Sequence, residues 1–148
     1  MFKVKISSVG KSKEPWLIAA LAEYEKRLSR QVEIEWIFAK DDAALIEKIT
    51  PPWICLDVEG EQPGSVGFAK KIQHLLTSHG SRLHFIIGGA EGIPKPILEK
   101  SAWVWSLSKL TFTHQMTRLI LLEQLYRALQ IDLGTAYHKA APNNKLDI

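Results

Sequence analysis

The chain has 148 residues, and its hydrophobic fraction of 46% and charged fraction of 24% are ordinary for one globular domain. No apolar run approaches the roughly 18 residues of a membrane span, and residues 1–10 carry no signal-peptide pattern, so we expect a cytoplasmic protein. A net charge of +3 is compatible with a nucleic-acid partner without indicating one, and the single cysteine, Cys55, excludes an intramolecular disulfide.

Apolar residues recur along the chain first with the period of a strand and then with the period of a helix. In chain order we expect a strand over 2–7, a helix over 14–28, a strand over 32–38, a short helix over 41–49, a strand over 53–58, a helix over 65–78, a strand over 83–87, a helix over 94–100, a strand over 103–107 and a final helix over 114–131. Ser12 and Thr113 are the expected N-caps of the first and last helices, and residues 59–64 read as a loop.

This alternation predicts the fold class: an α/β domain with a mostly parallel sheet and helices on both faces. Neither a repeat nor a linker interrupts the pattern, so we expect one domain over residues 1–148. Because ligands of open parallel sheets bind at the carboxyl ends of the strands, the loops after Leu56, Ile87 and Leu107 are where the functional site is expected.

The loop over residues 88–92 has the sequence Gly-Gly-Ala-Glu-Gly. Such glycines let a ligand approach the main chain, but they also serve in an ordinary strand-to-helix turn, and both readings stay open. The spacing is neither the dinucleotide fingerprint nor a P-loop, which argues against an enzyme that uses a dinucleotide cofactor.

The segment over residues 106–114 mixes hydroxyls, one cation and apolar residues, which suits either a purine site or a capped helix start. In the final helix, Glu123 and Arg127 have the spacing of a surface ion pair. Arg118 and Arg127 are candidates for binding phosphate, although solvated charge is the commoner fate of such residues. Cys55 reads as a small core residue.

Several of these segments together resemble one family. The matching motifs lie at residues 9–11, 22–28, 85–92, 105–112, 114–118, 122–128 and 136–139. With their order and spacing, they make the chain similar to the RlmH-type pseudouridine methyltransferases of large-subunit (23S) ribosomal RNA, which belong to the SPOUT superfamily.

The resemblance implies a SPOUT-type sheet with a C-terminal trefoil knot and a homodimer with the active site at the subunit interface. It also implies an S-adenosylmethionine-dependent enzyme that methylates ring nitrogen 3 of a pseudouridine on assembled ribosomes, without a metal. A non-catalytic SPOUT-like assembly factor that binds ribosomal RNA is the alternative.

Carried over to this sequence, the resemblance implies two sets of site residues. The methyl donor would contact Leu56, Gly88, Leu107, Ser108, Lys109, Leu110, Thr111 and Phe112. The base or substrate contacts would be His138 and Tyr137, with Glu123 and Arg127 behind them. The chain departs from the family pattern twice, since Thr113 replaces a proline and residues 140–148 form a C-terminal extension.

Overall fold

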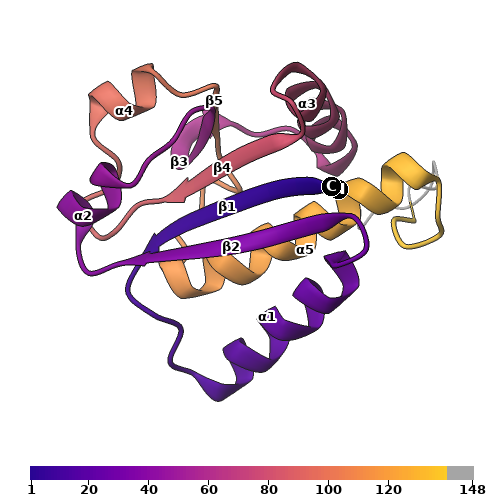
Figure 1. The fold of residues 1–148 in the computed structure, drawn as a ribbon, viewed down its shortest axis with the longest axis horizontal. Helices are drawn as coiled ribbons and strands as arrows, with labels where there is room; N and C mark the ends of the chain where they lie inside the picture. The colour runs from indigo at the N-terminus through magenta and orange to yellow at the C-terminus, as the bar shows by residue number, and fades with distance from the viewer. Residues whose placement is uncertain (140–148) are drawn as a thin grey trace.

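The computed structural model of the protein describes residues 1–139, so the expected extension lies outside the described residues. Its strands are β1 (Phe2–Val9), β2 (Val32–Ala39), β3 (Trp53–Glu61), β4 (Arg82–Ile87) and β5 (Trp103–Trp105). Its helices are α1 (Pro15–Leu28), α2 (Asp42–Glu47), α3 (Ser65–Ser78), α4 (Lys95–Glu99) and α5 (His114–Leu133). The strands form one parallel sheet in the order β2-β1-β4-β3-β5 (Figure 1).

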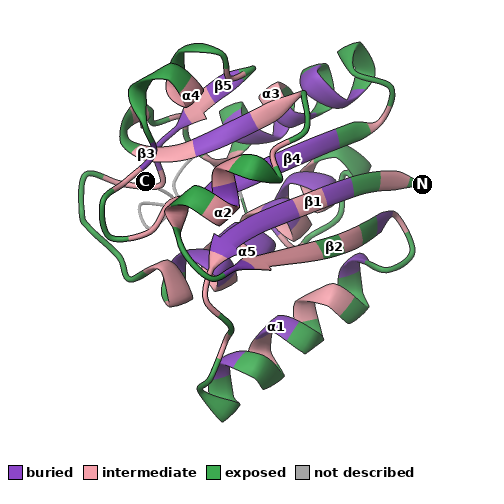
Figure 2. Ribbon diagram, turned by 60° about the vertical axis from the view of Figure 1, so that its left-hand side comes forward, coloured by how far each residue is buried: buried purple, intermediate pink, exposed green. Residues whose placement is uncertain are grey.

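Helices cover both faces of this sheet, because successive strand side chains point to opposite sides. The larger core packs α1, α3 and α5 against residues such as Ile6, Ile54 and Phe85. The smaller core lies under α2 and α4 and contains Cys55 and Ile86 (Figure 2). The predicted α/β class, with helices on both faces, is confirmed.

Cys55 is fully buried, as expected for a core residue. Burial raises the pKa of its thiol to about 11, so the thiol stays protonated at neutral pH.

Two local predictions were wrong. Ser12 does not cap α1, because the N-cap position is Glu14 and the Ser12 hydroxyl instead accepts a hydrogen bond from Arg118. Residues 59–61, expected in a loop, belong to β3, which resumes its pairing with β5 at Glu61 after a break in register. Their polar sequence reflects the exposure of residues 59 and 61 in the strand rather than a turn.

The final helix starts at the carboxyl edge of the sheet and runs back along it (Figure 1). The hydroxyl of Thr113 accepts a hydrogen bond from the Met116 backbone N–H over 3.2 Å, which confirms Thr113 as its N-cap. At the other end, Gly134 closes the helix in the left-handed conformation, with φ of 72°. Within residues 1–139 no helix has both the length and the apolar character that a bilayer crossing needs. The trefoil knot stays a prediction.

Candidate functional site

A cavity of about 540 Å³ opens at the carboxyl ends of β3, β4 and β5. Its volume is within the range of small-molecule sites. Its walls come from residues 56–58 of β3, where the pairing of this strand with β4 ends, and from the glycine loop after β4, the loop over 106–113 and the first turns of α5. These are the strand ends where the sequence analysis placed a functional site.

The glycine loop is shaped by close contacts that only glycine allows. A Cβ on Gly88 would lie 2.9 Å from Ile93 Cγ1 and 3.0 Å from the Gly92 carbonyl carbon. Gly92 has a φ of +76°, in the region that favours glycine. The glycine at position 88 therefore lets the loop fold closely against Ile93, while Gly88 itself lines the cavity.

The loop over 106–113 is braced by its own hydroxyl groups. Ser106 Oγ donates to the Ser108 carbonyl over 2.9 Å and accepts from Gln62 Nε2 over 3.0 Å. Ser108 Oγ in turn accepts from the backbone N–H of Leu110 over 3.0 Å. The predicted mixture of hydroxyls and apolar residues thus serves two purposes, because the serines fix the loop while leucines line the cavity.

The break in register of β3 supplies another wall. Asp57 and Val58 line the cavity where β3 leaves β5. Gly60 lets β3 come back into contact with β5, because a Cβ on Gly60 would lie 2.7 Å from the carbonyl carbon and oxygen of Val104.

Most of the residues predicted to contact the methyl donor lie together at this cavity. Its lining includes Leu56, Gly88, Leu107, Ser108, Leu110, Thr111 and Phe112. Lys109 is exposed and lies instead on a neighbouring depression with Glu59 and Gln62. Other lining residues lie outside the segments predicted to form the site, namely Asp57, Val58, Ile93 and Thr117. Their position at strand ends and at a helix start was the signal that would have found them.

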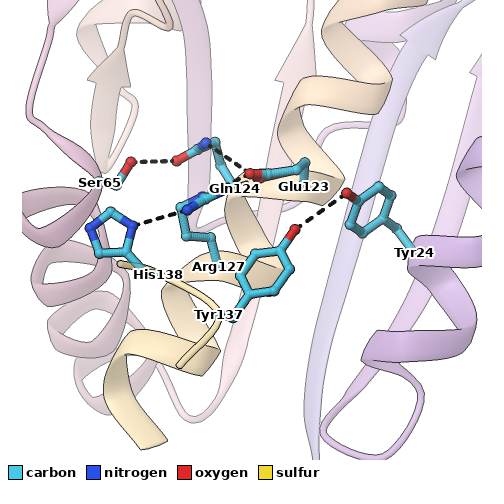
Figure 3. A network of polar contacts seen from close by, with 7 residues as sticks. All are labelled: Tyr24, Ser65, Glu123, Gln124, Arg127, Tyr137 and His138. Carbon is cyan, nitrogen blue, oxygen red and sulfur yellow. Dashed lines mark hydrogen bonds and ion pairs between the residues drawn. The ribbon is translucent and has the colours of Figure 1, made fainter. Parts of the chain in front are cut away.

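The residues predicted as base or substrate contacts form a separate polar cluster (Figure 3). Glu123 and Arg127 lie on the later part of α5, and Tyr137 and His138 lie on the segment after it. Arg127 Nε donates to Glu123 Oε1 over 2.8 Å, as their spacing predicted, and Arg127 Nη1 lies 3.0 Å from His138 Nδ1. The hydroxyls of Tyr137 and Tyr24 are 3.3 Å apart, and the guanidinium of Arg127 lies 4.9 Å from the centre of the Tyr137 ring.

Hydrogen bonding constrains how His138 can act. Arginine only donates, so Nδ1 of His138 is the acceptor in this pair and its neutral ring carries the proton on Nε2. Burial, followed by the hydrogen bond with Tyr24, raises the pKa of Tyr137 well above its usual range. Tyr137 therefore keeps its proton at neutral pH.

Within one chain the cluster does not line the cavity. His114, at the start of α5, lines the cavity, whereas Glu123 and Arg127 lie about 14 Å and about 20 Å further along the helix, at 1.5 Å per residue. A single chain therefore separates the two sets of residues that the resemblance placed in one site.

Comparison with known proteins identifies the family. The family model described as a predicted SPOUT methyltransferase matches residues 2–138. The chain belongs to the SPOUT methyltransferase family. This SPOUT methyltransferase is also 48% identical, over 141 residues, to the Ribosomal RNA large subunit methyltransferase H of Protochlamydia amoebophila (strain UWE25). The match covers 94% of this chain and all of that protein.

The fold is shared with a solved structure of low sequence identity. A probable methylase family protein from Haemophilus influenzae Rd KW20 superposes with a TM-score of 0.55 and 10% identity. The match covers 97% of this chain and 72% of that one. At this identity the likeness supports the SPOUT methylase fold, while the methyltransferase assignment rests on the family match.

Proposed function

We propose that this SPOUT methyltransferase transfers the methyl group of S-adenosylmethionine to ring nitrogen 3 of a pseudouridine in large-subunit ribosomal RNA. The observation that carries the proposal is the cavity at the carboxyl edge of the sheet in a chain that matches its named relative from end to end. Assembled ribosomes in the cytoplasm are the proposed substrate.

The residues around the cavity fit the donor. Leu56 and Leu107 offer apolar walls for a purine, and Gly88 of the glycine loop also lines the cavity. We assign donor contact to the lining residues that were predicted from the resemblance and to Lys109 at its margin. When bound, the donor supplies a methyl group already activated by its sulfonium, so the proposal includes no metal.

The chain's own task is to position the acceptor. The nitrogen to be methylated carries an imide-like proton, which it must lose, and it must approach the methyl group in line as the bond from sulfur to the methyl carbon breaks. We assign the role of base or of substrate contact to His138 and Tyr137, which Glu123 and Arg127 orient through the contacts described above.

We further propose that a second copy of the chain completes the site. The cluster around His138 and the cavity lie apart within one chain, so a homodimer would bring the cluster of one subunit to the cavity of the other. Large apolar side chains are exposed near the cavity and on α1, as an interface between copies requires. They are Trp16, Ile18, Leu110, Phe112 and Met116.

The first experiment is calorimetric titration of the purified protein with S-adenosylmethionine. We compare the wild type with Gly88→Ala, whose new Cβ would crowd Ile93, and with Gly64→Ala, where a Cβ meets nothing within 4 Å. Saturable binding that only Gly88→Ala weakens supports the donor site. A folded dimer that binds no donor favours the non-catalytic RNA-binding factor.

The acceptor is tested with undermethylated ribosomes and radiolabelled donor. Label should enter large-subunit RNA, and mass spectrometry of its nucleosides should find an N3-methylated pseudouridine. Label on another base or on small-subunit RNA would contradict the proposed acceptor.

A further inference from the structure

Arg118 is the largest side chain that the fold buries completely, with no exposed surface. Such burial fits neither of the two interpretations that the sequence offers for Arg118, a phosphate ligand or a solvated charge. Each of its five N–H groups has an acceptor at 2.6–3.3 Å. The acceptors are Ser8 Oγ, Ser12 Oγ, Gln115 Oε1 and the carbonyl oxygens of Val9 and Gly10.

All five acceptors are uncharged oxygens, so dipoles alone stabilise the buried cation. Burial lowers the pKa of Arg118 to about 10, which still leaves the guanidinium charged at neutral pH. The Phe38 ring adds a contact, its centre 5.0 Å from the guanidinium carbon. Because every donor is used, the guanidinium has no N–H left with which to hold a phosphate or another external anion.

The bonds of Arg118 join two segments that are far apart in the sequence. Four of its acceptors belong to residues 8–12, at the end of β1 and just beyond it. Gln115 strengthens the link, since its Nε2 donates to the Lys11 carbonyl over 3.2 Å. The first turns of α5 are thus tied to the carboxyl end of β1 by two side chains.

The same turns form a wall of the cavity. Thr113, His114 and Thr117 line it, and Arg118 follows Thr117 directly. On the other side of the link, Ser8 is paired in the sheet with Ile87, which also lines the cavity. A shift of α5 relative to β1 would therefore change the position of this wall of the cavity relative to the glycine loop.

We propose that Arg118 is a positioning residue, which holds the start of α5 against β1 so that the donor cavity keeps its binding shape. This role rests on the proposed donor site. It requires arginine rather than any cation, because the planar fork directs five N–H groups at five fixed oxygens, whereas lysine offers three from one nitrogen.

Chemical rescue tests the proposal. Arg118→Ala leaves the oxygen-lined space that the guanidinium filled, and free guanidinium ion at tens of millimolar should enter it. We expect the Kd for S-adenosylmethionine to rise about tenfold to a hundredfold in Arg118→Ala. Guanidinium should restore a large part of this loss, while it should not tighten binding by the wild type. Arg118→Lys should also bind weakly.

A variant of matched stability separates positioning from general destabilisation. Leu75→Ala truncates a buried side chain near the end of α3, away from the cavity lining. It should lower the melting temperature and keep the wild-type Kd. The proposal is overturned if folded Arg118→Ala binds as the wild type does, if guanidinium fails to restore binding, or if Leu75→Ala loses as much affinity. If Arg118→Ala does not fold, wild-type affinity in Arg118→Lys overturns it.

Hydrogen exchange keeps this test independent of the proposed function. Without any donor, backbone amides over 106–117 should exchange faster in the Arg118 variants than in the wild type, and those of β4 should not. If the wild type binds no donor, the proposed function fails, and the exchange rates still decide whether Arg118 holds this segment. Unchanged exchange would contradict the positioning role.

Discussion

The carboxylate of Asp42 accepts a hydrogen bond from the backbone N–H of Gly89, with Oδ1 and N 3.0 Å apart. This bond connects the start of α2, on the smaller-core face of the sheet, to the glycine loop at the cavity. The contact is close, because a Cβ on Gly89 would lie 2.6 Å from the same oxygen. The loop is therefore held from behind by a side chain that does not line the cavity.

We predict that Asp42→Ala weakens donor binding severalfold. The substitution removes the acceptor of the half-buried Gly89 amide and releases the loop. Asp42→Asn keeps an oxygen that can accept the bond and should bind almost as the wild type does. Calorimetric titration with S-adenosylmethionine measures all three proteins.

The neighbouring residue provides the control. Asp41 caps α2 by accepting from the Ala44 backbone N–H over 2.8 Å, so Asp41→Ala should cost about 1 kcal/mol of stability. It leaves the bond to Gly89 in place and should preserve donor affinity. Equal losses of affinity in Asp41→Ala and Asp42→Ala would mean that α2 as a whole, rather than this bond, supports the loop.

The order of elements and the edge of the sheet that carries the cavity were predictable, because hydrophobic periodicity and strand alternation depend on local sequence. Thr113 was predictable for the same reason, since capping involves residues three apart. The burial of Arg118 was not, because its acceptors lie more than a hundred residues away in sequence, apart from Gln115. The prediction of Ser12 as an N-cap was wrong for the same reason, because its hydroxyl accepts a hydrogen bond from Arg118, which is distant in sequence.

The second part of β3 was missed because Gly60 looks like a loop residue. Packing requires a glycine at position 60, since a Cβ on Gly60 would meet the backbone of Val104 and Trp105 at 2.7–2.8 Å. We predict that Gly60→Ala lowers the free energy of unfolding by about 1–3 kcal/mol, because backbone atoms cannot move aside as a side chain can. Urea unfolding measures the change. Gly64→Ala has open space around its Cβ and should lose less, at most about 1 kcal/mol because Gly64 is the N-cap of α3, and equal losses would refute the packing argument.

His84 gives the fold a dependence on pH. Its Nδ1 accepts from the Thr50 backbone N–H over 3.2 Å, so the neutral ring donates from Nε2 to Ser7 Oγ at 2.6 Å. Burial is the main cause that lowers the pKa of His84 below 6.5. The unfolded chain therefore binds more protons between the folded pKa and 6.5, and stability falls as the pH drops through that window.

We predict that this loss of stability shrinks in His84→Asn. Urea unfolding at about pH 7.5 and about pH 5.5 compares the wild type with the variant, and the difference between the two pH values should be smaller in the variant. His79→Gln, which changes an exposed histidine, should retain the wild-type difference. If His84→Asn retains it too, His84 is not the source of the pH dependence.

The proposed role of His138 predicts a split between turnover and donor binding. His138→Ala should lower single-turnover methyl transfer to ribosomes by about tenfold or more and leave the Kd for S-adenosylmethionine within about twofold. The reason is that His138 lies outside the lining of the donor cavity in its own chain. Unchanged turnover would remove His138 from the reaction, and a large rise in Kd would place it at the donor instead.

A mixed dimer decides whether two subunits share one site. Gly88→Ala impairs the cavity of its own chain, and His138→Ala impairs the cluster of its own chain. If each site combines the cavity of one subunit with the cluster of the other, a heterodimer of these variants contains one site with both changes and one intact site. Random pairing makes half of the dimers heterodimers, so co-expression should restore roughly a quarter of wild-type methyl transfer. If each chain held a complete site, every site in the mixture would carry one of the two changes and no activity would return.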